Sequence, residues 1–264
     1  MRLLCAGLTD VGIARDHNED NFYLSRAGEP LCVVADGMGG HRSGEVASEV
    51  AVKTIVDYYK ETVISPEDEA SALGKRFTWP WKRKKDANAD EMRLVQSLLC
   101  ANKAIFEASE SNELYKGMGT TVVSAYFVEE GVYVAWIGDS RCYRLRNGEL
   151  EQISEDHSLA NEYVKMGIIS KKDLEHFPYK NVVTRACGLA SEVEADSLFT
   201  PTEDGDIYLL CSDGLSDCIN DEKIRTILMA YEDLDAAAVA LVEAANQGGG
   251  TDNITVILAK TLLA

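Results

Sequence analysis

The sequence has no pair of cysteines at CxxC spacing and no apolar stretch long enough to span a membrane. Its seven cysteines are scattered along the chain, which indicates neither a disulfide framework nor a zinc site. The apolar start of the chain, residues 1–8, is too short for the core of a signal peptide. We therefore expect a cytoplasmic protein with reduced thiols and no membrane insertion.

Basic residues are also scarce. The 264 residues include 26 Lys and Arg against 44 Asp and Glu, which gives a formal net charge of -18. Such a charge repels nucleic acid, so we expect no nucleic-acid partner. Hydrophobic residues make up 46% of the chain, an ordinary globular composition for one large domain or two small ones.

One segment departs from this acidic composition. Residues 74–90 place six lysines and arginines around Trp79-Pro80-Trp81, between two predicted helices. The favoured interpretation is a solvated loop, because charge runs usually face solvent. The alternative is a docking patch, residues 75–85, for an acidic partner.

Hydrophobic patterns predict strands and helices in separate groups. Seven segments read as strands: 2–9, 20–26, 30–36, 120–128, 131–139, 141–146 and 206–213. Asn147-Gly148 predicts a tight hairpin and hence antiparallel pairing. Helical periodicity appears at 44–61, 90–110, 158–166, 221–230 and 234–246. This arrangement favours an α+β sandwich over a doubly wound parallel sheet.

Acidic residues recur where these strands end. Asp36, Asp139 and Asp213 each close an apolar strand beside a glycine, and acidic turns supply Glu19, Asp20 and Asp252. If these carboxylates converge, their mutual repulsion requires cations, and an all-oxygen ligand set selects Mg²⁺ or Mn²⁺. The D-x-D-x-D-G pattern of a calcium loop is absent. Two such ions sharing carboxylates are typical of enzymes that hydrolyse phosphate esters.

Two neighbouring residues fit the same chemistry. Gly37 allows the backbone to approach a metal closely, and no Gly-Lys-Ser/Thr follows it as in a nucleotide-binding loop. Arg15 lies four residues before Glu19 and is a candidate to bind a phosphate group.

Eight motifs now stand in order along the chain: "RDHNED" (15–20), "VVADGMGGHRSG" (33–44), "GTT" (119–121), "WIGDSRCYR" (136–144), "DHSL" (156–159), "VVTRACG" (182–188), "CSDGLSD" (211–217) and "GGGTDNITV" (248–256). Their number and order resemble the metal-dependent protein serine/threonine phosphatases of the 2C type, in their compact bacterial form. The resemblance implies a single catalytic domain over 1–264, folded as a four-layer αββα sandwich. Two central antiparallel sheets would be flanked by helix pairs, with a flap subdomain at 158–181 beside the site.

The resemblance also implies the activity. The enzyme would hydrolyse phosphoserine and phosphothreonine in proteins by direct attack of a metal-bound water, without a phosphoenzyme. Its partners would be phosphoprotein substrates, and it would oppose a bacterial serine/threonine kinase acting on the same targets.

The family pattern further implies two tightly bound Mn²⁺ or Mg²⁺ ions. Asp36 would bridge the two ions. Asp213 and Asp252 would complete one site. The Gly37 carbonyl and Glu19 would serve the other, which Asp20 would touch directly or through water.

Three further roles follow from the same resemblance. Asp139, with Asp213, would hold a weaker third ion. Asp217 would lie just behind these ligands, and Arg15 would hold the substrate phosphate.

The general acid is where the chain departs from many eukaryotic members. Those carry a histidine directly after Asp-Gly, and here Met38 stands at that position. His41 is the histidine we predict for this role, and a hydrogen bond that fixes the loop is the alternative. His157, next to Asp156, is assigned a structural role.

Two other functions compete with a protein phosphatase. A two-metal phosphodiesterase or nuclease is disfavoured by the net charge and by the lack of a basic stripe near the motifs. A degenerate member used for binding or sensing is disfavoured because Asp36, Asp213 and Asp252 are all present.

Overall fold

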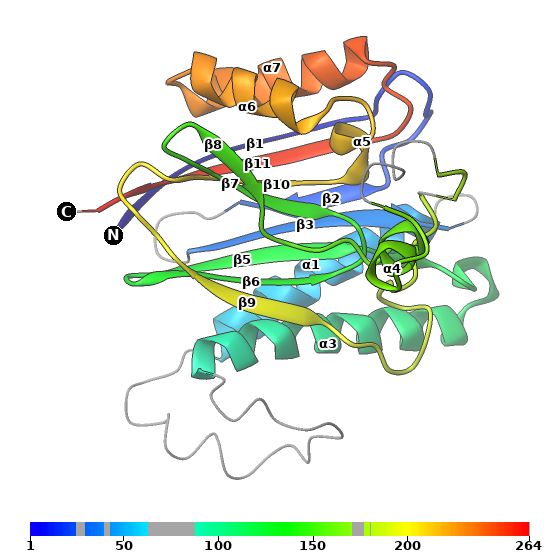
Figure 1. The fold of residues 1–264 in the computed structure, drawn as a ribbon. Helices are drawn as coiled ribbons and strands as arrows, with labels where there is room; N and C mark the ends of the chain where they lie inside the picture. The colour runs from blue at the N-terminus through cyan, green and yellow to red at the C-terminus, as the bar shows by residue number, and fades with distance from the viewer. Residues whose placement is uncertain (25–29, 40–42, 63–87, 171–176, 180, 264) are drawn as a thin grey trace.

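The computed structural model describes residues 1–24, 30–39, 43–62, 88–170, 177–179 and 181–263, with two antiparallel sheets at its centre (Figure 1). The first sheet has the order β1 (Arg2–Asp10), β11 (Ile254–Leu262), β10 (Ile207–Cys211), β7 (Arg141–Arg146) and β8 (Glu149–Gln152). The second has the order β2 (Asp20–Tyr23), β3 (Leu31–Met38), β5 (Val122–Val128), β6 (Gly131–Ile137) and β9 (Asp196–Pro201), and β4 (Gly119–Thr120) also pairs with β3.

Two pairs of helices form the outer layers. Side chains of α6 (Asp221–Ala230) and α7 (Leu234–Gln247) share a buried cluster with the first sheet. Side chains of α1 (Ser43–Glu61) and α3 (Ala89–Ser111) share another with the second sheet. Shorter helical segments are η1 (Glu113–Tyr115), α4 (Leu159–Lys165) and α5 (Asp213–Ser216). The predicted αββα sandwich is confirmed.

The alternation of side chains along each strand explains the layers. In β3, Val33 belongs to the cluster that faces α1 and α3, whereas Val34 belongs to the cluster between the sheets. In β10, Leu209 faces α6 and α7, whereas Leu210 lies between the sheets. Because successive residues of a strand point to opposite faces, a strand covered on both sides is apolar throughout.

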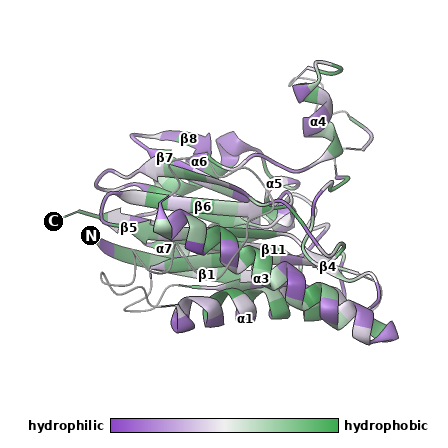
Figure 2. Ribbon diagram, turned by 90° about the horizontal axis from the view of Figure 1, so that it is seen from below, coloured by the Kyte–Doolittle hydropathy of each residue, from purple (hydrophilic) through white to green (hydrophobic). Residues whose placement is uncertain are grey.

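The helices begin at polar caps and bury one face. Asn88, Asn220 and Asp233 each accept a hydrogen bond from a backbone N–H in the first turn of α3, α6 and α7. In α1, Ala47, Ala51 and Ile55 are fully buried at a spacing of four residues. Figure 2 accordingly shows hydrophobic and hydrophilic residues alternating along α1 and α3.

The predicted elements are present with small shifts at their ends. All five predicted helices occur, and all seven predicted strand segments contain a strand. The sequence reading did not identify β9 or β11 as strands. Residues 75–85 lie outside the described residues, as does most of the 74–90 segment, so the docking patch stays a prediction. The predicted flap contains α4, and its residues 171–176 and 180 are also outside. No helix in the described ranges is long and apolar enough to cross a membrane.

Candidate metal centre

The predicted carboxylates come from strand ends and from the start of α5, whose place Figure 1 shows, and they are close enough to act on one another electrostatically. Asp20 and Asp36 lie opposite each other in the β2–β3 register. Asp139 follows β6, Asp213 follows β10, and Asp252 precedes β11. Burial raises the pKa of Asp36 well above its usual range, and the charges of the other four aspartates add to this shift. The five acids therefore act on one another electrostatically.

One carboxylate oxygen of Asp20 accepts hydrogen bonds, and the other accepts none from the described residues. It is 8% exposed, and its Oδ2 accepts hydrogen bonds from Thr255 Oγ1 at 2.7 Å and Ser212 Oγ at 2.8 Å. Its Oδ1 is buried and has no hydrogen-bond partner within the described part of the chain. Burial raises the pKa of Asp20 to about 7 despite the two hydroxyl donors. The side chain is thus oriented but not neutralised.

Asp213 begins α5 directly after β10. Gly214 follows it because a Cβ at that position would lie 2.0 Å from the carbonyl oxygen of Asn253. Burial raises the pKa of Asp213 to about 6, and the charges of Asp217 and Asp252 contribute. Its Oδ1 is another buried oxygen without a hydrogen-bond partner among the described residues.

Glu19 lies in a tightly packed turn beside Gly37. The Gly37 N–H donates to the Glu19 carbonyl at 3.2 Å, and the Glu19 N–H donates to Asn253 Oδ1 at 2.7 Å. A Cβ on Gly37 would lie 2.1 Å from the Gly44 carbonyl oxygen, so only glycine fits there. Burial raises the pKa of Glu19, and its Oε1 is also buried without a partner in the described ranges.

Asp252 is the carboxylate at the mouth of the cluster. Arg15 Nη2 donates to its Oδ2 at 2.7 Å, with side-chain exposures of 50% for Arg15 and 33% for Asp252. This hydrogen bond raises the pKa of Arg15. The predicted phosphate-binding arginine therefore lies beside the predicted metal ligands, and in this structure its partner is Asp252.

Asp139 approaches the cluster from β6. It is 8% exposed, and burial raises its pKa to about 8, with Asp213 the next contribution. Gly138 before it has a φ of 112°, a value that favours glycine. The turn thus brings a fifth aspartate close to Asp213.

These residues fit hard divalent cations. Among the described residues, three buried carboxylate oxygens lack a hydrogen-bond partner, and oxygen-only donor sets select Mg²⁺ or Mn²⁺. Within the described residues, no group of three or more His, Cys, Asp or Glu side chains is already arranged to hold a metal ion.

The sequence reading missed the side chains that hold these acids. Ser212 and Thr255 orient Asp20, and Asn253 Nδ2 donates to the carbonyls of Val11 and His17 at 2.9 and 2.8 Å. Their position in the sequence could have indicated this role, because each is next to or near a predicted ligand in "CSDG" or "TDNIT". His41 lies outside the described residues, so its role as general acid stays a prediction.

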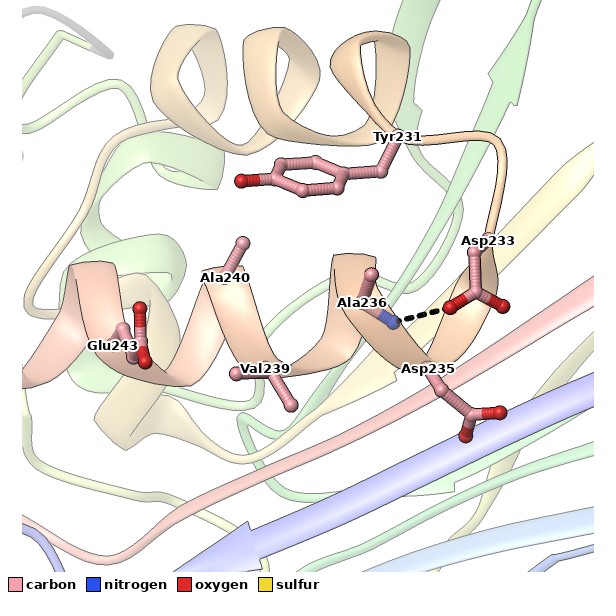
Figure 3. A pocket seen from close by; sticks show the side chains of 7 residues that line it. All are labelled: Tyr231, Asp233, Asp235, Ala236, Val239, Ala240 and Glu243. Carbon is pink, nitrogen blue, oxygen red and sulfur yellow. Dashed lines mark hydrogen bonds between the residues drawn. The ribbon is translucent and has the colours of Figure 1, made fainter.

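A separate pocket lies over α7 (Figure 3). It has a volume of about 390 Å³, and its lining includes Tyr231, Asp233, Val239 and Glu243. The Tyr231 ring lies over one turn of α7, and Asp233 accepts a hydrogen bond from Ala236 N at 3.1 Å. None of its lining residues belongs to the carboxylate cluster, so this pocket is not the metal centre.

Comparison with known proteins identifies the family. A family profile described as "Protein phosphatase 2C" matches residues 14–247. The chain belongs to the protein phosphatase 2C family. This confirms the predicted family, and with it the predicted enzyme class of protein serine/threonine phosphatase.

Relatives within the family match nearly end to end. Serine/threonine phosphatase stp of Listeria welshimeri is 40% identical over 252 residues, covering 95% of this chain and 92% of the relative. The serine/threonine phosphatase PstP/Ppp of Mycobacterium tuberculosis has a TM-score of 0.83 and 34% identity, covering 98% of this chain and 99% of that structure. A second structure, of the PstP catalytic domain in complex with two manganese ions, has a TM-score of 0.79 and 33% identity over 98% of both chains. This phosphatase therefore shares its fold with these relatives over nearly its whole length.

Proposed function

We propose that this protein phosphatase hydrolyses phosphoserine and phosphothreonine in proteins at the carboxylate cluster, with two tightly bound Mn²⁺ or Mg²⁺ ions. The observation that carries the proposal is the set of buried carboxylate oxygens, Glu19 Oε1, Asp20 Oδ1 and Asp213 Oδ1, that no donor satisfies in the described part of the chain. Buried charge without a partner is strongly destabilising, so a functional cation site is the physical reason to keep it.

The chain's own residues have separate tasks in this reaction. Asp36 would be shared by the two ions, Asp213 and Asp252 would complete one site, and Glu19, Asp20 and the Gly37 carbonyl would serve the other. The chemistry that such ions supply is a water of lowered pKa and neutralisation of the phosphoryl oxygens.

Arg15 binds the substrate phosphate. Its contact with Asp252 supports this role, because an arginine at 2.7 Å from a predicted ligand lies within reach of a phosphate held there. Replacing Arg15 by Ala should raise KM for a phosphopeptide more than it lowers kcat.

Asp139, together with Asp213, would hold a weaker third ion. With few protein ligands such an ion would keep several waters, as Mg²⁺ prefers, and would supply a proton source near the leaving oxygen. Asp139→Ala should keep two tight sites by calorimetry. It should lose more turnover on a phosphothreonine peptide than on p-nitrophenyl phosphate, because nitrophenolate needs little protonation.

The biological partners are a serine/threonine kinase and the phosphoproteins that it produces, with residues 1–264 acting as one catalytic unit in the cytoplasm. None of the seven cysteines, all of which lie in the described residues, forms a disulfide, which fits a reducing compartment.

The deciding experiment measures hydrolysis of a phosphothreonine peptide and of p-nitrophenyl phosphate with Mn²⁺ or Mg²⁺, and again after EDTA treatment and dialysis. We expect activity only with metal, restored when metal is returned. Turnover that survives the removal of metal would overturn the proposal.

A further inference from the structure

His157 is a buried histidine that the proposed reaction does not use. It lies between β8 and α4, is 4% exposed, and its ring lies 6.3 Å from that of Trp136 in a stacked arrangement. Its contacts lead to the turn that carries Asp139.

Both peptide groups of Gly138 are hydrogen-bonded to His157. The His157 N–H donates to the Gly138 carbonyl at 3.0 Å, and the Gly138 N–H donates to His157 Nδ1 at 3.1 Å. His157 thus binds the turn at Gly138 through both its backbone and its ring.

The contact with Gly138 also fixes the state of the imidazole ring. Because Nδ1 accepts a hydrogen bond, the ring proton lies on Nε2, which is 3.2 Å from Asp196 Oδ2. Arg185 Nη1 lies 3.4 Å from Asp196 Oδ1, so the far side of the ring is held by a carboxylate that is itself paired.

The turn around Asp139 is also packed closely against Thr121. A Cβ on Gly138 would lie 2.5 Å from Thr121 Cβ, and the Thr121 and Ser140 hydroxyl oxygens are 2.6 Å apart. The residues before and after Asp139 are therefore both fixed, which leaves the Asp139 carboxyl group buried beside Asp213.

We propose that His157 is a positioning residue for Asp139: by binding both peptide groups of Gly138, it holds the Asp139 carboxylate toward Asp213 and sets the affinity of the weaker cation site. The inference rests on the proposed role of Asp139. Residues that orient metal ligands without touching the metal change affinity by about 10–100-fold when they are replaced.

Two substitutions separate the contacts of the imidazole ring. In His157→Asn the amide oxygen can take the place of Nδ1 and accept from Gly138. In His157→Gln the amide instead reaches the position of Nε2 and Asp196. The proposal predicts that Asn preserves the turn and that Gln does not.

The first measurement needs no metal. Hydrogen exchange of the Gly138 amide, followed in EDTA by NMR or in a peptide spanning the turn, should be faster in His157→Gln and close to wild type in His157→Asn. The second is a calorimetric titration with Mn²⁺. The weak site should bind about tenfold less tightly in His157→Gln and normally in His157→Asn, while the two tight sites are unchanged in both.

Trp136→Phe is the matched control. It keeps an aromatic ring beside His157, removes the Nε1 hydrogen bond to the Glu155 carbonyl at 2.8 Å, and shortens a buried side chain next to the turn without touching the contacts between His157 and Gly138. It should leave Gly138 exchange and the weak site unchanged. The same losses in Trp136→Phe as in His157→Gln would mean a general loosening and would overturn the proposal, as would equal behaviour of the Asn and Gln variants.

Asp139→Ala separates this inference from the proposed function. If this variant leaves the Mn²⁺ titration unchanged while His157→Gln still speeds Gly138 exchange, the third cation is wrong and the positioning of the Asp139 turn stands. If His157→Gln leaves Gly138 exchange at the wild-type rate, the positioning role is overturned whatever the titration shows.

Discussion

Strand β10 has an aspartate at each end, and the two carboxyl groups have opposite surroundings. Asp206, before the strand, accepts from Arg146 Nε at 2.8 Å and from the Glu203 N–H at 2.9 Å, and its Oδ2 pairs with Arg146 Nη2. Asp213, after the strand, has a buried Oδ1 without a partner among the described residues. Burial alone would raise the pKa of Asp206, but Arg146 and the other donors outweigh it and lower the pKa. Burial raises the pKa of Asp213 to about 6.

The difference separates a structural carboxylate from a functional one. At the Asp206 end the chain supplies its own cation, and the pair stays closed. At the Asp213 end several carboxylates lie together, and Arg15 pairs with Asp252, so an external cation would neutralise the buried acids. Such an arrangement lowers the stability of the metal-free protein and is retained where the cation has a function.

The largest expected effect is that of Asp36→Asn. The substitution removes the central charge and keeps the shape, so phosphopeptide turnover should fall by more than about 100-fold, beyond the usual cost of losing an indirect partner. In EDTA the same variant should be more stable than wild type to heating, because one buried negative charge is gone.

The measurements are steady-state kinetics over a Mn²⁺ titration and melting in EDTA. A variant that keeps wild-type turnover would show that Asp36 is not a shared ligand. A lower melting temperature in EDTA would show that its charge is already neutralised by the protein.

Asp206→Asn should produce the opposite result. Its side chain is 1% exposed, and its loss leaves Arg146 with Glu203 as the remaining ion-pair partner. Breaking a buried pair from one side should lower the free energy of unfolding by about 3 kcal/mol. Turnover per folded molecule should stay near wild type. Urea unfolding and kinetics on the same sample test both statements, and a variant with wild-type stability but weak activity would reverse the assignment of the two ends.

The carboxylates of the candidate metal centre and the Asp206 ion pair also predict a pH dependence of stability. Burial raises the pKa of Asp20 to about 7 and that of Asp139 to about 8, from an ordinary value of 3.8. Their contribution to stability is full below the ordinary pKa and is lost as pH rises through the raised values. Asp206, with its lowered pKa, contributes stability above the ordinary value that is lost as pH falls through the lowered one.

In EDTA, the melting temperature should therefore fall from about pH 5 to pH 8. Saturating Mn²⁺ should remove most of this fall, because bound carboxylates are stable in their charged form. Asp206→Asn should change only the acid side of the curve. An EDTA curve that rises between pH 5 and 8 would contradict the direction of the shifts.

Local patterns in the sequence predict the candidate acids but not strand β11. Asp36, Asp139 and Asp213 carry a local signal, an acid beside a glycine at a strand end, and Glu19, Asp20 and Asp252 stand in acidic turns. Strand β11 lies between β1 and β10 in its sheet and is covered on both faces. Val256 and Leu258 face the helices, and Ile257 and Ala259 face the other sheet, so the polar alternation that marks a strand is absent.

Contacts between distant residues could not be predicted from local patterns. Arg15 and Asp252 are 237 positions apart, and nothing in either motif names the other as a partner. The hydroxyl groups that orient Asp20 are invisible for the same reason, since serine and threonine are ordinary residues in turns and strands. His157 was assigned a structural role from its motif, and only the fold shows that its ring meets Gly138.

The smallest expected effect compares two threonines of β11. Thr255, near the metal centre, donates to Asp20 Oδ2 at 2.7 Å, and Thr261, at the other end, donates to the Glu203 carbonyl at 2.9 Å. Both residues are fully buried, and Val has nearly the shape of Thr.

Thr261→Val should lower the free energy of unfolding by about 1 kcal/mol, the ordinary worth of one hydrogen bond, and leave metal binding unchanged. Thr255→Val should have a similar cost in stability and should also weaken Mn²⁺ binding by about tenfold, because Asp20 loses one of the two donors that orient it. Calorimetric Mn²⁺ titration and urea unfolding of the two variants measure the difference between the two ends of β11. Equal Mn²⁺ affinities in the two variants would mean that Ser212 alone suffices to orient Asp20.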